Sequence, residues 1–194
     1  MDLIGGWVLP VTWATLGTVI VVCALFSRRS DRAFATGIGA VSVLWLLGGA
    51  AANAAMIADG STYTGFADGS PIAFVHDTWE SLVVPHHHFF IGLLIAGEAL
   101  AGLLVLVPGR VREVDLLALV AFNATLVVFG WGFAIWAVPL VVALLLLRRA
   151  ARERNPDRHP ERTSHREVRT LRHRPSDGAS SGRHRSPRSR VPSP

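Results

Sequence analysis

Long runs of uncharged, apolar residues alternate with short polar segments over the first 149 residues of the chain. The first run, residues 7–26, contains 20 residues and no charge. At about 1.5 Å per residue, a helix of this length matches the hydrocarbon layer of a bilayer, which is roughly 30 Å thick. Similar runs cover residues 34–57 and 85–107. The pattern predicts membrane-spanning helices rather than helices that bury one apolar face in a soluble core.

The last apolar run, residues 116–147, is too long for one ordinary span. As a single helix, its 32 residues would extend about 48 Å. Gly130 and Gly132 lie near its middle among four aromatic residues, and Pro139 follows soon after. Aromatic residues favour the membrane interface, where a chain can turn. We therefore expect a helical hairpin here, with a single helix as the alternative.

Together these runs predict an all-α fold, a polytopic bundle of transmembrane helices with five spans, or with four if residues 116–147 form one helix. The expected spans are residues 7–26, 34–57, 85–107, 115–130 and 133–148, with an extracytoplasmic loop at residues 58–84. Within that loop, residues 72–84 are expected to form a short interfacial helix. Trp79 would anchor this helix, because Trp favours the boundary between lipid and water.

Charge is unevenly distributed along the chain, and its distribution predicts the orientation. Residues 148–194 contain 14 Arg and five acids, a net charge of +9, whereas the whole chain carries +5, which leaves −4 for residues 1–147. Because Arg-containing loops stay in the cytoplasm, the Arg-free acidic loop should lie outside. This places the N-terminus outside and the C-terminus in the cytoplasm. All 19 basic residues are Arg, a usage that we associate with high-GC bacteria, so the expected location is a bacterial plasma membrane.

Residues 150–194 form a segment of different character, rich in Arg, Ser, Pro and His. With few large aliphatic residues, it cannot bury enough apolar surface to fold alone, so we expect a disordered cytoplasmic tail. Nucleic acid is disfavoured as its partner, because the tail has no Phe, Tyr or Trp to stack on bases. Arginines next to a span favour anionic lipid instead. The expected lipid or partner contacts are Arg148, Arg149, Arg152 and Arg154.

Three polar residues inside the expected spans are candidates for proton or substrate chemistry: Glu98, Asn123 and Asn53. Glu98 lies about 15 Å, or about ten residues, inside its span, which places it near the bilayer centre. An ionised acid is costly there, so Glu98 should be protonated, paired or next to a water-filled cavity. Two interpretations stay open. Glu98 either hydrogen-bonds Asn123 or Asn53 in a structural role, or it handles a proton or a substrate.

Five residues before or at the outer end of the third expected span are candidate metal ligands: His76, Glu80, His86, His87 and His88. His76 and Glu80 are four residues apart and share a helix face, whereas the three consecutive histidines point in different directions. Imidazoles with a carboxylate suit zinc or copper. The alternative is that these histidines only anchor a helix end. Haem is disfavoured because no other span contains His, and the main expectation is that no cofactor is bound.

The sequence contains no motif for soluble enzyme chemistry. It lacks a Gly-rich phosphate loop, a nucleophile elbow and an HExxH zinc site. The single cysteine, Cys23, excludes a disulfide framework and a Cys-based zinc site within one chain. Enzymatic activity is therefore left open but disfavoured.

Two stretches carry a resemblance to known proteins: FADGSPIAFVHDTWESLVVPHHHFFIGLLIAGEALAGLLVL and, after it, FGWGFAIWAVPLVVALLLLRR. They resemble a group of uncharacterised bacterial integral membrane proteins, which is loosely similar to the DoxX-like four-helix membrane proteins. The resemblance covers residues 59–147, and its landmarks are Trp79, Pro85, His86, Glu98 and residues 130–139. It implies an accessory role in a redox complex and supplies no catalytic residue. The additional first span departs from the four-helix pattern.

Three functional hypotheses follow. The leading one is a non-enzymatic accessory or scaffolding subunit of the plasma membrane, bound to another membrane protein or to copies of itself. Its basis is residues 48–56, which are almost all small and favour close helix packing in lipid. The second is a small proton-coupled transporter or carrier that uses Glu98. The third is an extracytoplasmic metal-binding module.

Overall fold

The structure, a computed structural model, describes residues 8–155, which contain helices and no strand. In chain order, the elements are α1 (Val8–Phe26), α2 (Asp31–Val43), the π-helical stretch η1 (Leu44–Ala51), α3 (Ala52–Ala58), α4 (Ala73–Thr78), the π turn η2 (Trp79–Val83), α5 (His87–Leu104), α6 (Arg110–Leu126), the 3-10 turn η3 (Val127–Phe129) and α7 (Trp131–Glu153). The all-α prediction is confirmed over this range. The start of the tail predicted to be disordered, residues 150–194, is instead ordered, because α7 continues to Glu153 and Ala150, Ala151 and Asn155 are buried. The rest of that tail, residues 156–194, lies outside the described residues.

Three helical segments are long and apolar enough to cross a membrane: the continuous rod α2–η1–α3, α5 and α7. α1 is apolar but shorter, and α6 carries charged residues in its first turns. Large apolar side chains also cover the outside of the bundle; Leu25, Leu103 and Ile135 are each more than half exposed. A soluble protein rarely exposes so much continuous apolar surface, whereas lipid covers it well. The composition and surface are those of a helical membrane protein.

Helix boundaries differ from the expected spans where local capping decides them. α2 begins three residues earlier than expected, because the Ser30 hydroxyl accepts a hydrogen bond from the Ala33 amide. α6 begins five residues early, directly after Gly109, whose φ of 82° separates it from the preceding turn. α5 begins two residues late, at His87, because the chain turns after η2. α7 continues to Glu153, since residues 148–153 are good helix formers.

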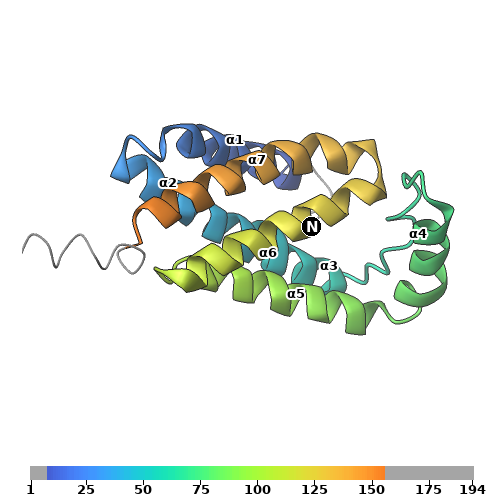
Figure 1. The fold of residues 1–194 in the computed structure, drawn as a ribbon. Helices are drawn as coiled ribbons and strands as arrows, with labels where there is room; N and C mark the ends of the chain where they lie inside the picture. The colour runs from blue at the N-terminus through green and yellow to red at the C-terminus, as the bar shows by residue number, and fades with distance from the viewer. Residues whose placement is uncertain (1–7, 156–194) are drawn as a thin grey trace, which may run out of the picture. The chain divides into compact units, whose positions relative to one another are not determined.

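The helical hairpin expected in residues 116–147 is present. α6 and α7 pack side by side and are joined through η3 and Gly130 (Figure 1). Gly130 has a φ of 121°, a backbone conformation that L side chains rarely adopt. It also lies against Gly69 in the loop before α4, where an added Cβ would overlap the Gly69 carbonyl. The single-helix alternative for this stretch is therefore wrong, and the turn requires glycine.

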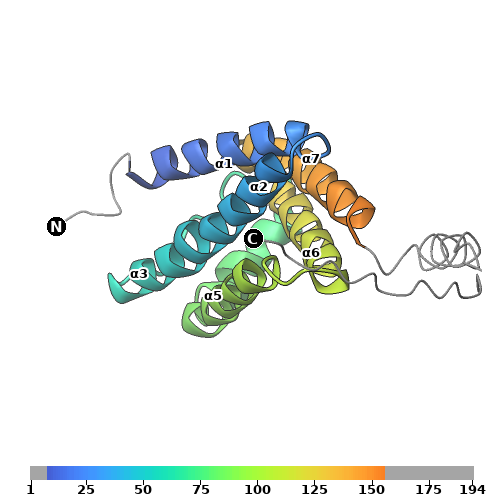
Figure 2. The same cartoon turned by 90° about the vertical axis from the view of Figure 1, so that its left-hand side faces the viewer.

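The helices pack around a core between α1, α2, η1, α6 and α7, and α5 packs mainly against the α2–η1–α3 rod, whose opposite side contacts α1 (Figure 2). Gly102 permits the close approach of α5, because an added Cβ there would lie 2.7 Å from Leu46 Cγ. The Ser42 hydroxyl donates a hydrogen bond to the Gly102 carbonyl at 2.6 Å. Fully buried large side chains of the core include Ile20, Val41, Leu44, Leu116, Leu144 and Leu147.

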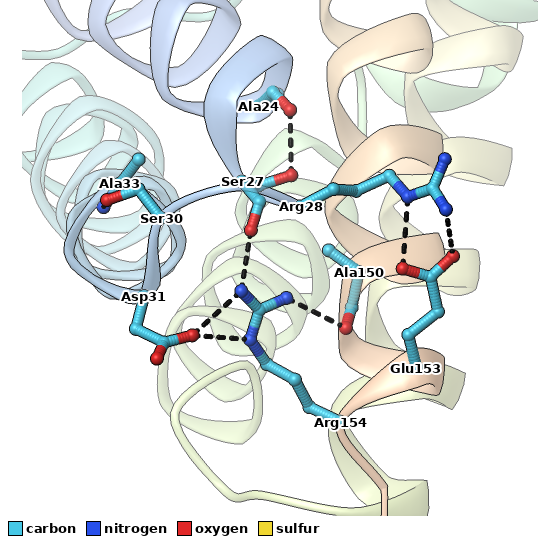
Figure 3. A network of polar contacts seen from close by, with 9 residues as sticks. All are labelled: Ala24, Ser27, Arg28, Ser30, Asp31, Ala33, Ala150, Glu153 and Arg154. Atoms are coloured by element: carbon cyan, nitrogen blue, oxygen red, sulfur yellow. Dashed lines mark hydrogen bonds and ion pairs between the residues drawn. The ribbon is translucent and has the colours of Figure 1, made fainter.

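Arginines gather at the end of the bundle where α1 turns into α2 and where α7 ends (Figure 3). The Arg154 guanidinium donates to Asp31 at 2.9 Å and to the Ser27 carbonyl at 2.7 Å. The Arg28 guanidinium forms an ion pair with Glu153 at 2.9 Å. These contacts connect the last turn of α7 to the corner between α1 and α2.

The other arginines that were expected to contact lipid also have partners within the chain. The Glu113 carboxylate accepts a hydrogen bond from Arg152 at 3.2 Å, and the Glu113 carbonyl accepts one from Arg148 at 3.3 Å. Arg149 lies 3.6 Å from Glu153. The Arg149–Glu153 pair is exposed on both sides, and such pairs are weak and exchange readily with other partners, whereas the Glu113 carboxylate is buried. Contact of these arginines with anionic lipid stays a prediction.

The Gly130 turn provides a test of the fold. We expect Gly130→Ala to lower the free energy of unfolding by about 1–3 kcal/mol, because it strains the backbone and displaces Gly69. The control is Gly132→Ala in the first turn of α7, where an added Cβ meets no atom within 4 Å. Unfolding by SDS in mixed micelles, followed by circular dichroism, measures both. Equal stability of the two variants would contradict the role of Gly130.

Candidate functional site

Glu98 is buried between α5 and the rod formed by α2, η1 and α3, with 7% of its surface exposed. It lies on the inner face of α5 with Ile91 and Gly102, the other buried residues of this helix. The Asn53 amide, on α3, donates a hydrogen bond to Glu98 Oε2 at 2.9 Å. Of the two asparagine partners considered from the sequence, the structure therefore selects Asn53. Asn123 makes no hydrogen bond to Glu98; its amide donates to the Leu119 carbonyl of its own helix.

The π-helical stretch η1 makes room for the carboxyl group. Gly49 lies in this stretch, one turn before Asn53, and an added Cβ at Gly49 would come within 2.8 Å of Glu98 Cδ. The neighbouring Gly48 carbonyl accepts a hydrogen bond from the Trp13 indole of α1 at 3.0 Å. A π-helical stretch inside an α-helix frequently marks a functional site. The sequence indicated small residues here but not the change of helix type.

Tyr63, in the loop after α3, holds Asn53 in place and was missed by the sequence analysis. Its hydroxyl lies 3.0 Å from Asn53 Oδ1 and 3.2 Å from the Asn53 carbonyl, and it donates to this pair of acceptors. Burial raises the pKa of Tyr63, and the nearby Glu98 carboxylate raises it further. The one feature that distinguishes Tyr63 in the sequence is that it is the single Tyr of the chain. A hydrogen-bonded chain thus runs from Tyr63 through Asn53 to Glu98.

Four aromatic rings pack together beyond this chain, and we call them the aromatic roof: Phe66, Trp79, Phe129 and Phe133. Phe66 lies at the centre, with ring centroids 4.8 Å from Trp79 and 4.9 Å from Phe133. The Trp79 indole donates to the Tyr63 carbonyl at 2.9 Å. Trp79 therefore packs against protein on one side, and its role as an interfacial anchor stays a prediction.

The roof and the Glu98 network enclose a partly open cavity of about 520 Å³, the main cavity. Its wall is formed by α1, the rod of α2, η1 and α3, the loop that holds Tyr63, η2, α5, α6, η3 and the first turn of α7. Most of the lining is aromatic or aliphatic, including Trp13, Ala52, Met56, Phe66, Trp79, Phe90, Leu94, Phe122 and Phe129. Four polar side chains line it beside the indoles: Asn53, Tyr63, Glu98 and Thr125. The arrangement suits a small, mostly apolar molecule with one polar group.

A second, almost wholly apolar cavity of about 360 Å³ lies between α1, α6 and α7. It shares Trp13, Leu126 and Phe133 with the main cavity, so these side chains separate the two spaces. Asn123 lines the second cavity, and its amide donates to the Leu119 carbonyl at 2.8 Å. Asn123 therefore makes a bond within its own helix and is not part of the Glu98 network.

The ligand set proposed for zinc or copper, His76, Glu80, His86, His87 and His88, is not assembled. The His76 ring lies 3.2 Å from the carboxylate of the next residue, Asp77, and 3.5 Å from that of Asp68, in the loop before α4. Glu80 accepts a hydrogen bond from the Gly65 amide at 3.0 Å instead of facing His76. Within residues 8–155, no three His, Cys, Asp or Glu side chains are grouped so that they could hold a metal ion.

Comparison with known proteins adds no family assignment. No protein-family model, curated protein or solved structure matches the chain. The resemblance to DoxX-like proteins stays a prediction. The function is therefore argued from the geometry of the main cavity.

The loop over the cavity should respond to pH through His76. The pKa of His76 is raised above its ordinary value, first because its ring hydrogen-bonds Asp77, and further by the charge of Asp68. A raised pKa means that protonated His76 stabilises the folded loop below about pH 6.5, and that this contribution is lost as the pH rises through the raised pKa. Histidine-selective NMR, with His76→Gln to assign the resonance, measures the titration.

Asp77→Asn should lower the pKa of His76, because it removes the largest of the favourable contacts. Asp59→Asn is the control, because Asp59 is exposed in the same loop and does not contribute to this pKa. If both variants leave the titration of His76 unchanged, the contact with Asp77 is absent in solution.

Proposed function

We propose that this protein is an integral protein of the bacterial plasma membrane that binds a small, largely apolar molecule in the main cavity. The observation that carries the proposal is a cavity of about 520 Å³ with an aromatic and aliphatic wall and one buried carboxyl group, Glu98. Small-molecule sites are typically concave, mostly apolar and about 300–1,000 Å³ in volume, with few polar groups that orient the ligand. Among the sequence hypotheses, the carrier that uses Glu98 is nearest to this function.

In this proposal α1, the rod of α2, η1 and α3, α5, α6 and α7 all cross the membrane, with the N-terminus outside and the C-terminus in the cytoplasm. The distribution of charge supports this orientation. The corner between α1 and α2 and the start of α6 carry arginines, whereas the opposite end, at residues 59–80, has four acids and no arginine. Arginine-rich loops stay in the cytoplasm. The aromatic roof and the main cavity then lie toward the outer side.

The scaffolding hypothesis rests on the small-residue segment, residues 48–56, and only part of this segment is used inside the bundle. Residues of the small-residue segment pack inside this chain: Gly48 against Trp13, and Gly49 against Glu98. Ala51 and Ala54 of the same segment are exposed, so scaffolding stays a second proposal. An accessory role beside a redox complex is a separate proposal that rests on the resemblance alone.

Filling the main cavity tests the proposed function. Ala52→Phe places a ring into the cavity, whereas Ala54→Phe, the control, changes an exposed position two residues further along α3. We expect Ala52→Phe to weaken the binding of the neutral probe phenylbutanol at least about tenfold, because the added ring occupies the same space. Equilibrium dialysis with the protein in zwitterionic nanodiscs, corrected with empty nanodiscs, measures the affinity. No binding to the unmodified protein, or equal binding to both variants, would refute the proposal.

Cysteine labelling tests the orientation. In a Cys23→Ala background, a membrane-impermeant maleimide should label Ser61→Cys from outside intact spheroplasts and Ser180→Cys only in inverted vesicles. Ser61 lies in the loop after α3, and Ser180 belongs to the Arg-rich tail. Labelling of both positions from the same side would reject the arrangement with five spans.

A further inference from the structure

The buried Glu98 carboxyl has no positively charged partner in the part of the chain that the structure describes. No Arg or His side chain forms an ion pair with it, and no Arg or His lines the main cavity. The chain contains no Lys, and the arginines before residue 148 lie in the α1–α2 corner and the start of α6. A buried carboxylate without a partner is costly. The site is therefore electrostatically incomplete unless a proton or a cationic group occupies it.

The hydrogen bonds around Glu98 present its carboxyl as an acceptor. The Tyr63 hydroxyl donates a hydrogen bond to Asn53 Oδ1. This bond orients the Asn53 amide, so that its NH₂ group donates to Glu98 Oε2. Both protonation states of the carboxyl can accept this bond, and the ionised carboxylate, an acceptor-only group, keeps further acceptor capacity. The remaining acceptor capacity of the carboxylate matches an N–H group of a ligand.

The wall of the cavity also favours a cation over an anion. Aromatic rings attract cations to their faces, and this attraction is stronger where water is excluded. Tyr63, Phe66, Trp79 and Phe90 belong to this wall. An anionic ligand would meet the charge of Glu98 and no cationic side chain. A bare metal ion is disfavoured, because Glu98 is the sole acidic residue in the lining.

Acidic side chains on the surface near the cavity also favour a cation over an anion. Asp68 and Asp77 lie between Phe66 and Trp79 of the aromatic roof along the chain, and 70% and 77% of their side-chain surface is accessible. Negative charge around a binding site raises the local concentration of cations and speeds their association. A cation would thus be attracted first by the loop and then by the buried carboxyl.

We infer that the ligand of the main cavity is a lipophilic amine, whose ammonium group binds the Glu98 carboxylate and whose apolar body lies against the aromatic lining. This inference rests on the proposed function, because it specifies the chemical class of the molecule bound there. Asn53 and Tyr63 are positioning residues in this arrangement, since they orient the carboxyl through hydrogen bonds.

The test compares two probes of nearly the same shape, phenylbutylamine and phenylbutanol, on the full chain in zwitterionic nanodiscs at pH 7.5. The amine is protonated at this pH and the alcohol is neutral. We expect the unmodified protein to bind the amine at least about tenfold more tightly, because a charge-assisted hydrogen bond is roughly twice as strong as a neutral one. In Glu98→Gln the ratio of the two affinities should fall to about one. Glu98→Asp, which keeps the charge, should restore part of the preference.

Asp59→Asn is the matched control, because it removes an exposed acid outside the cavity. It should leave the ratio of the two affinities unchanged. Equal affinity of the unmodified protein for amine and alcohol would overturn the inference and leave the proposed function intact. A preference for the amine that persists in Glu98→Gln would also overturn it. Failure of both probes to bind would refute the proposed function itself, so the two failures are distinguishable.

Discussion

The burial of the Glu98 carboxyl is the constraint to which the centre of this structure is adapted. A carboxyl group in apolar surroundings is costly unless other groups hydrogen-bond or neutralise it. Gly49 leaves the space that the carboxyl occupies, and Asn53 donates a hydrogen bond to it. Tyr63, which is distant from Glu98 in the sequence, fixes the orientation of Asn53. Three segments therefore converge on one group, and they form one wall of the main cavity.

The opposite wall depends on contacts between two loops. The loop before α4 reaches the turn between α6 and α7, where Gly69 lies against Gly130 and the Ser70 hydroxyl donates to the Val128 carbonyl at 2.7 Å. These contacts bring Phe66 next to Phe129 and so assemble the aromatic roof. The contacts that complete the fold at this end therefore also shape the cavity, which links the stability of the turn to the geometry of the site.

The two ends of the bundle differ in how their charges are used. At the end where α7 stops, arginines connect α7 to α1, α2 and α6, as the pairs Arg28–Glu153 and Arg152–Glu113 show. At the other end, Asp68 and Asp77 face solvent, with His76 as their nearest cationic group. The same asymmetry that indicates orientation in a membrane therefore leaves the cavity end negative. The proposed orientation and the proposed preference of the site for a cation both rest on this one feature of the sequence.

The sequence by itself determined the helices, the hairpin in residues 116–147, the separation of charge and the position of Glu98 and Asn53 within apolar runs. These features are local. An apolar run, a glycine at a turn and an acid within an apolar run each have a physical consequence that depends on neighbouring residues in the sequence. Only the tertiary structure decided that Asn53 rather than Asn123 bonds Glu98, that Trp79 packs inward, and that His76 and Glu80 do not share a ligand. Those outcomes depend on the rotation of each helix and on the path of the loop after α3. Both are set by packing between distant segments, which hydropathy and spacing along the chain do not encode.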